Sequence, residues 1–149
     1  MEQDDNYWMA EALKLAKQAA SEEEVPVGAI VVYDGEAIGR GFNSSIKNND
    51  PSAHAEILAL RQAAQNIKNY RLVDTVLYVT LEPCPMCVGA MLHARIKKLV
   101  FGASDPKTGA VGGNINLLAY SWNHKIDYKG GVLTEDCSNL LRDFFQARR

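Results

Sequence analysis

The chain has 149 residues, of which 47% are hydrophobic, and a net charge of -2 at pH 7. A chain of this length buries ~70% of its unfolded surface, enough for one substantial core, so we expect residues 1–149 to form a single domain. The slightly acidic charge argues against a dedicated nucleic-acid binder, because such proteins are often strongly basic, and any contact with nucleic acid must be local. The start "MEQDDNYWM" is unlike a secretory signal and no apolar run approaches the ~20 residues of a membrane span, so we expect a cytoplasmic protein without a membrane partner.

The first half of the chain predicts a helix, a hairpin and a second helix. Apolar residues recur at helical spacing over residues 6–20. In "VPVGAIVVYDGEAIGRGFN" two apolar runs are joined by Asp34-Gly35, a favoured two-residue turn, which predicts a β-hairpin. After a polar loop, Asp50 or Ser52 is expected to cap the helix of "NNDPSAHAEILALRQAAQ".

The second half alternates between strands and helices. We expect strands in "DTVLYVTLE" and "KKLVFGAS" and helices in "PCPMCVGAMLHARI" and "TEDCSNLLRDFFQARR". Strand-helix-strand alternation indicates parallel pairing, with helices on both faces of a mixed sheet. The sequence therefore predicts the α/β class, as a three-layer α/β/α sandwich with a hairpin at one side.

Two of the three cysteines lie three residues apart in "TLEPCPMCVGAM". If Cys84 caps the helix and Pro85 takes its first position, Cys84 and Cys87 lie on the same side of the first turn and both sulfurs can reach one point. Three cysteines make a poor disulfide framework. The pair alone is compatible with a thioredoxin-like redox site or with half of a zinc site.

A catalytic zinc site needs one more protein ligand, and a histidine and a carboxylate occur together in "AHAE". We place His54 at the entrance of its helix as the third ligand and Glu56 inside the helix as the proton shuttle. The alternatives are a capping or core histidine and a first-turn acid favoured by the helix dipole. His93 and His124 lack a partner motif and are expected to be structural, and Cys137 is expected to be a small buried residue.

Together, His-x-Glu followed by Pro-Cys-x-x-Cys is identified as the signature of the zinc nucleobase deaminases. In such a site two thiolates and a neutral imidazole hold Zn²⁺, which lowers the pKa of bound water from about 15.7 toward ~7. Glu56 can then accept the water proton, deliver it to a ring nitrogen and protonate the departing amine. A redox pair would need neither His54 nor Glu56, so the deaminase interpretation is favoured.

Nearly the whole chain resembles the bacterial TadA-type tRNA-specific adenosine deaminases of the cytidine/deoxycytidylate deaminase superfamily. The resemblance rests on "YWMAEALKLAKQAA", "EVPVGAIVV", "GFN", "DPSAHAEILALRQAA", "NYRLVDTVLYVTLEPCPMC" and "FGASDPKTGAVGG". It implies conversion of adenosine to inosine at the wobble position of a tRNA anticodon. It also implies a cytidine-deaminase-like fold with a mixed five-stranded sheet, one Zn²⁺ per subunit, and a homodimer in which each active site borrows surface from its partner.

The same resemblance assigns the individual residues. His54, Cys84 and Cys87 match the zinc ligands, and Glu56 matches the proton shuttle. The substrate-binding residues that it implies are Asn43 and the backbone N–H of Ala55 on the flipped base, with Asp105, Lys107 and Thr108 of "SDPKTG" on the neighbouring nucleotides.

An acid can accept from a ribose 2′-hydroxyl and a lysine can neutralise phosphate, but Asp-Pro-Lys-Thr-Gly is also an ordinary turn sequence. Of Phe144 and Phe145 on the last helix, one is expected to pack in the core and the other, with Phe145 as the candidate, to lie at the edge of the anticodon site; the alternative that both are core residues is the preferred one.

Two other functions share parts of this pattern. A free-base or nucleoside deaminase acting on guanine, cytosine or cytidine would use the same zinc site, but Asn43 with "SDPKTGAVGG" resembles the RNA-editing branch. A non-enzymatic zinc module would have no need of Glu56.

Overall fold

The computed structural model describes residues 3–148. The helices are α1 (Asp5–Ser21), α2 (Ala55–Ile67), α3 (Pro85–Ala94) and α4 (Thr134–Gln146), with one short 3-10 helix, η1 (Leu117–Ala119). The strands are β1 (Gly28–Tyr33), β2 (Glu36–Phe42), β3 (Val76–Leu81), β4 (Lys98–Ala103) and β5 (Asp127–Lys129). Within residues 3–148 no helix is both long and apolar enough to cross a membrane.

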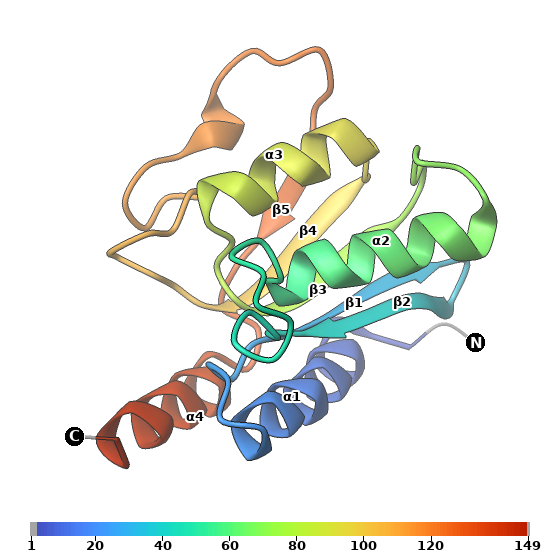
Figure 1. Ribbon diagram of the computed structural model, residues 1–149. Coiled ribbons are helices and arrows are strands. Elements are labelled where there is room, and N and C mark those ends of the chain that lie inside the picture. The colour runs from blue at the N-terminus through green and yellow to red at the C-terminus, as the bar shows by residue number, and fades with distance from the viewer. Residues whose placement is uncertain (1–2, 149) are drawn as a thin grey trace.

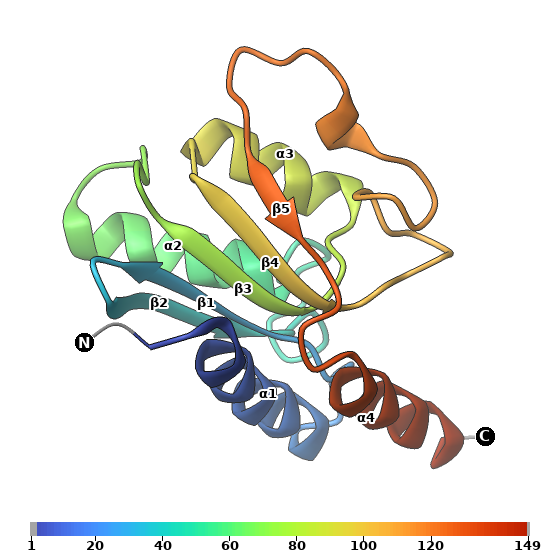
Figure 2. The same cartoon turned by 180° about the vertical axis from the view of Figure 1, so that it is seen from behind.

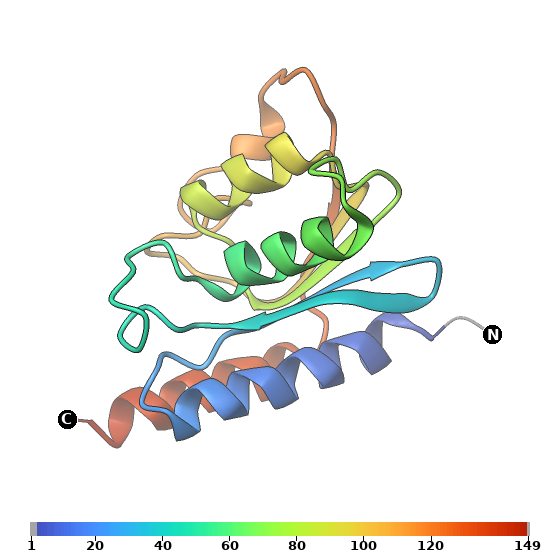
Figure 3. The same ribbon diagram turned by 45° about the vertical axis from the view of Figure 1, so that its right-hand side comes forward.

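The strands form one mixed sheet between two layers of helices. Their order is β2-β1-β3-β4-β5, in which β1 is antiparallel to β2 and β3, whereas β3, β4 and β5 run parallel. Helices α2 and α3 cover one face, and α1 and α4 cover the other (Figures 1 and 3). Each face has its own apolar core. The predicted three-layer sandwich with a mixed five-stranded sheet is confirmed.

The hairpin follows its turn chemistry. Asp34 and Gly35 both have positive φ, 49° and 77°, as a two-residue hairpin turn that matches the strand twist requires.

No sequence pattern predicted strand β5, the edge strand seen in Figure 2. It has three residues, all exposed, so it carries neither an apolar run nor an alternation.

Helix α2 lies directly on the hairpin because small residues face each other there. A Cβ atom on Gly41 would lie 2.5 Å from the carbonyl oxygen of Ala55 and 2.8 Å from the backbone nitrogen of Ala59. The absence of side chains at this contact lets the backbones approach closely. The beginning of α2 is thereby held against the end of β2.

The expected cap of α2 is wrong. The helix begins after His54, which is the N-cap, and not after Asp50 or Ser52. Asp50 instead accepts hydrogen bonds of 2.8 Å from both the backbone nitrogen and the hydroxyl of Ser52, which forms a local turn before the helix. The turn brings the chain back toward the sheet, so that His54 stands at the helix entrance as predicted.

Candidate active site

Two helices begin at the same end of the sheet and bring the metal-type side chains together. His54 is the N-cap of α2 and Cys84 the N-cap of α3, where Pro85 takes the first helical position. Both cap residues have extended backbones, with φ/ψ of -75°/154° and -78°/172°, and neither side chain makes a capping hydrogen bond. The ring and the thiol are therefore available to a ligand.

The three donor atoms form a nearly equilateral triangle. The His54 Nδ1 atom lies 3.6 Å from the Sγ atoms of both Cys84 and Cys87, and the two sulfurs are 3.7 Å apart. Tetrahedral zinc with Zn–S of ~2.3 Å and Zn–N of ~2.0 Å separates two sulfurs by about 3.8 Å, and sulfur from nitrogen by about 3.5 Å. The residues present thus fit a zinc ion with three protein ligands.

The thiols share a proton in the metal-free protein. The hydrogen bond from Cys87 lowers the pKa of Cys84 to about 4 despite partial burial, and His54 acts in the same direction. The same shared proton, together with burial, raises the pKa of Cys87. The hydrogen bond to Cys84 also raises the pKa of His54. The opposite shifts of the two thiols make Cys84 the thiol that ionises first, and binding of a divalent cation requires that Cys87 lose its proton as well.

Glu56 lies in the first turn of α2, and only 4% of its surface is exposed. Burial raises its pKa to about 7, and the negative charge of Cys84 acts in the same direction. A carboxyl group that titrates near neutrality can both accept and donate a proton, which suits general acid-base catalysis.

A cavity of about 120 Å³ holds the predicted catalytic residues and part of the predicted substrate set. Its lining comprises Val25, Val27, Asn43, His54, Glu56, Leu81, Glu82, Cys84, Asp105 and Thr108. An outer cavity of about 460 Å³ shares Asp105 and Thr108 with it and adds Lys107 and Phe145. Phe144 is buried, whereas Phe145 is 47% exposed. The fold thus gathers side chains as far apart in the chain as Val25 and Phe145 around one opening.

Asn43 and Ala55 contact each other. The backbone N–H of Ala55 donates to Asn43 Oδ1 over 2.8 Å. This bond uses the carbonyl end of the amide and leaves its Nδ2 end as the donor for a substrate. Contact of the Ala55 N–H with a base would have to replace or share this hydrogen bond.

Asp105 organises the turn in which it lies. Its carboxylate accepts from the backbone nitrogens of Lys107 (3.0 Å) and Thr108 (3.2 Å) and from the Thr108 hydroxyl (2.8 Å). The ordinary turn is therefore present. Two carboxylate oxygens offer about four acceptor sites, so acceptor capacity for a ribose hydroxyl remains.

Two buried acids escaped the sequence analysis. Glu24 is 2% exposed and accepts from the backbone nitrogens of Ile46 (3.2 Å) and Lys47 (2.8 Å), and Glu82 is 3% exposed and holds the loop of residues 104–113. For Glu82 the available signal was its place between a buried strand and Pro83-Cys84, where a charged residue needs an internal partner.

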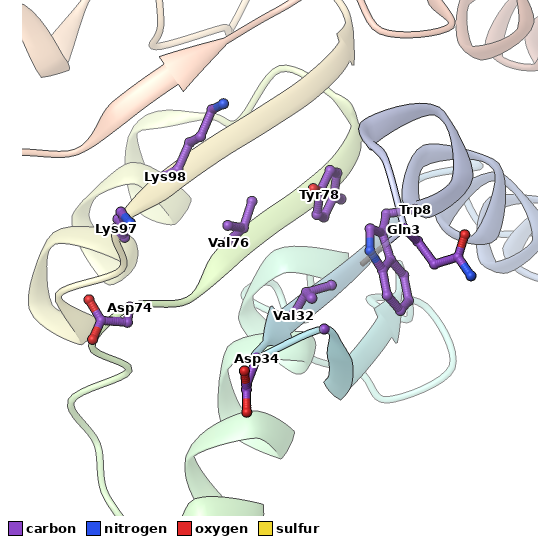
Figure 4. Close-up of a pocket in the computed structure, with 10 residues that line it drawn as sticks. Gln3, Trp8, Val32, Asp34, Asp74, Val76, Tyr78, Lys97 and Lys98 are labelled. Atoms are coloured by element: carbon purple, nitrogen blue, oxygen red, sulfur yellow. The ribbon is translucent and has the colours of Figure 1, made fainter. Parts of the chain in front are cut away.

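A cavity elsewhere on the sheet lacks the residues that this chemistry needs. A cavity of about 270 Å³ lies by the sheet near Trp8 and Tyr78 (Figure 4), but its lining contains no histidine, cysteine or glutamate. The remaining candidates also lie outside the donor triangle. His124 Nε2 is 2.7 Å from the carbonyl oxygen of Ile96, His93 lines a separate cavity of about 250 Å³, and Cys137 is buried against Gly102.

An α/β/α sandwich with a Cys₂His donor set beside a buried glutamate defines a hydrolytic deaminase of the cytidine-deaminase-like fold. The sequence model of the MafB19-like deaminases matches residues 3–149. The chain belongs to this family and to the TadA-type tRNA-specific adenosine deaminases.

Individual relatives support this membership. The tRNA-specific adenosine deaminase of Haemophilus influenzae is 55% identical over 147 residues, covering 97% of this chain and 85% of the relative. That of Bacillus subtilis is 45% identical over 146 residues, covering 97% and 91%. A structure from a study of A-to-I editing by tRNA:A34 deaminases has a TM-score of 0.88 at 40% identity, covering 91% of this chain and 99% of that one. A guanine deaminase from Nitrosomonas europaea shares the fold, with a TM-score of 0.85 at 24% identity over 97% of this chain and 85% of that one.

Proposed function

We propose that this protein hydrolyses adenosine to inosine and ammonia at wobble position 34 of a tRNA anticodon, the position named for its structural relative. The proposal rests on one observation: the Cys₂His donor triangle and Glu56 lie together at a cavity that adjoins the outer cavity lined by Asp105, Lys107 and Phe145. Membership of the tRNA-specific adenosine deaminases supports the choice of reaction.

We propose one Zn²⁺ per chain, held by His54, Cys84 and Cys87. When bound, zinc would supply Lewis acidity that makes water a nucleophile at neutral pH. The fit of the donor distances to tetrahedral zinc supports this assignment, as does the low pKa of Cys84.

Glu56 is the proposed proton shuttle. It would accept a proton from the attacking water and pass it to ring nitrogen N1 as oxygen adds to C6 of adenine. It would then take the proton of the hydroxyl group added at C6 and pass it to the amine, so that the C6–N bond breaks, the C6 carbonyl of inosine forms and ammonia leaves. Its burial and its pKa of about 7 support both halves of this cycle.

The other site residues predicted from the sequence would hold the RNA. Asn43 would orient the base through its Nδ2 group, with the Ala55 N–H as the second base contact. Asp105, Lys107 and Thr108 would meet the neighbouring nucleotides, and Phe145 would stack at the edge of the opening. Their shared place around the two adjoining cavities supports this set.

The proposed assembly is a homodimer. Exposed apolar side chains on α3 and the following segment support it, since Met86, Ile115, Tyr120 and Trp122 are each at least 39% exposed and a cavity of about 250 Å³ lies between these elements. Met86 lies between the two cysteine ligands in sequence, so a partner on this face would reach the rim of the catalytic cavity. Analytical ultracentrifugation with a Trp122→Glu variant tests this proposal, which predicts a monomer for the variant.

We further propose that residues 1–149 form one deaminase domain and that the protein acts in the cytoplasm. The family match over residues 3–149 supports the first statement. A tRNA substrate and three free thiols are suited to a reducing compartment, which supports the second.

The test is inosine formation by the zinc-loaded protein. The substrates are an anticodon stem-loop RNA with adenosine at the wobble position and, in parallel, free adenosine, cytidine and guanine. Conversion of the stem-loop alone is the expected result. Conversion of a free base or nucleoside with the RNA untouched would overturn the RNA substrate and retain the deaminase chemistry.

A further inference from the structure

Glu82 lies at the junction between the metal ligands and the predicted substrate loop. It follows β3 directly and precedes Pro83 and Cys84 in the chain. Its side chain is 3% exposed and belongs to the lining of the catalytic cavity. A carboxylate in such a place requires internal hydrogen-bond donors.

All of these donors come from the loop of residues 104–113. Glu82 Oε1 accepts from the Ser104 hydroxyl (3.0 Å) and the Asp105 backbone nitrogen (2.9 Å). Its other oxygen, Oε2, accepts from the backbone nitrogens of Val111 and Gly113, both over 2.8 Å. One carboxylate thus gathers both ends of the loop, across separations of 22 to 31 residues.

The loop is also packed tightly on this carboxylate. The backbone nitrogen of Ala110 donates to the carbonyl oxygen of Pro83 over 2.8 Å, beside the metal ligand Cys84. A Cβ atom on Gly109 would collide with the Glu82 carboxylate. The loop therefore has little freedom to move relative to Cys84 while the Glu82 bonds are intact.

We propose that Glu82 is a positioning residue for the RNA substrate. By holding both ends of the 104–113 loop, it sets where Asp105, Lys107 and Thr108 stand relative to the metal ligands and Glu56. Both Glu82 oxygens are engaged by the loop, so the residue acts through the loop and takes no part in proton transfer. This inference rests on the proposed function.

A double-mutant cycle tests the inference. The variants Glu82→Gln, Asp105→Ala and the combination of both are compared by kcat/KM on the anticodon stem-loop RNA. Misplacement of a substrate contact is expected to lower kcat/KM by about 10- to 100-fold in each single variant, with zinc content unchanged. If Glu82 acts through Asp105 and its loop, the double variant loses little more than the worse single variant. Losses that multiply would overturn the inference.

Glu24→Gln is the matched control. Glu24 is an equally buried acid, but it accepts from the backbone nitrogens of Ile46 and Lys47 in a different loop. Its effect is expected to multiply with that of Asp105→Ala, because the two sites share no partner. Equal non-additivity in both cycles would show a general loss of structure and would refute a specific role for Glu82.

Two further measurements guard against misfolding. Gly109→Ala crowds the Glu82 carboxylate from the loop side and keeps its charge, so the expected loss of kcat/KM is again non-additive with that of Asp105→Ala.

The second measurement is hydrogen exchange in the zinc-loaded wild type without RNA, in which the amides of Val111 and Gly113 should exchange slowly with deuterium. Exchange as fast as in an open loop would overturn the inference even if no variant folds. A wild type that is inactive on RNA would refute the proposed function, whereas an active wild type with multiplying losses refutes only the role of Glu82.

Discussion

The two walls of the catalytic cavity are held in place in different ways. On one wall, His54, Glu56 and the two cysteines occupy the caps and first turns of two helices that rest on the sheet. On the other wall, the 104–113 loop is anchored by hydrogen bonds to the buried side chain of Glu82 and to the carbonyl oxygen of Pro83. The reacting groups are thus fixed by regular structure, whereas the substrate contacts depend on a few long-range bonds.

This difference predicts that the two walls can be broken separately. Glu56→Gln should have the largest effect, because it removes the proton shuttle and leaves all three donor residues of the triangle in the chain. We expect turnover to fall by about 10³-fold or more, with zinc content and RNA affinity retained. Single-turnover inosine formation and elemental analysis of the same sample check this prediction. A variant of near-normal activity would remove Glu56 from the mechanism.

Cys84→Ser should damage the same wall in another way. Replacing the thiolate is expected to weaken zinc binding, so that activity and metal are lost together. The wild type should be stabilised by metal, by about 2.7 kcal/mol at a free zinc concentration of 100 times the dissociation constant, and the variant by much less. Thermal melting with zinc and with a chelator measures this difference. Equal shifts in both proteins would exclude Cys84 as a ligand.

Asn43 lines the catalytic cavity together with residues of both walls, so Asn43→Ala should affect substrate binding and the start of α2 together. The variant loses the base contact and leaves the Ala55 N–H without the acceptor that it now uses. We expect kcat/KM to fall about 10- to 100-fold, because a buried polar group left without its partner costs ~1–3 kcal/mol. Asn43→Asp keeps the acceptor for Ala55 and removes the donor, so it serves as the matched variant. Full activity of Asn43→Asp would argue that the amide donor does not contact the base.

Lys107→Ala should have the smallest effect and should change only the contacts that the 104–113 loop makes with the substrate. Its side chain is expected to neutralise one phosphate of a single-stranded loop. The slope of log kcat/KM against log salt should therefore become shallower by about 0.7, with kcat at saturating RNA nearly unchanged. Measurement from low to physiological salt tests this. An unchanged slope would mean that Lys107 stays in solvent when RNA binds.

The same contrast explains how far the sequence carried the prediction. The wall that carries the metal ligands follows local rules. Pro85 in the first helical position, with a cysteine before it and another after it, places two thiols on one turn, and the structure has this arrangement. The hairpin was equally predictable from Asp34-Gly35. The cap of α2 was predicted wrongly because Asp50 and Ser52 satisfy each other in a local turn.

The residues of the 104–113 loop and their contacts could not be predicted from local sequence rules. Residues such as Asp105 and Lys107 were named through family resemblance, because a turn sequence by itself carries no sign of what it faces. Glu82 was missed because its partners lie 22 to 31 positions away. The short edge strand β5 escaped for a related reason, since its exposed residues pair with a neighbour that only the complete sheet supplies.

The most direct test of this account is a zinc titration of the metal-free protein, with inosine formation in the anticodon stem-loop RNA as the readout. The account predicts no activity without metal, then a linear rise that saturates at one zinc ion per chain, and no rise at all for Glu56→Gln. Full activity in the metal-free protein, or saturation only after a second zinc ion has bound to each chain, would contradict it.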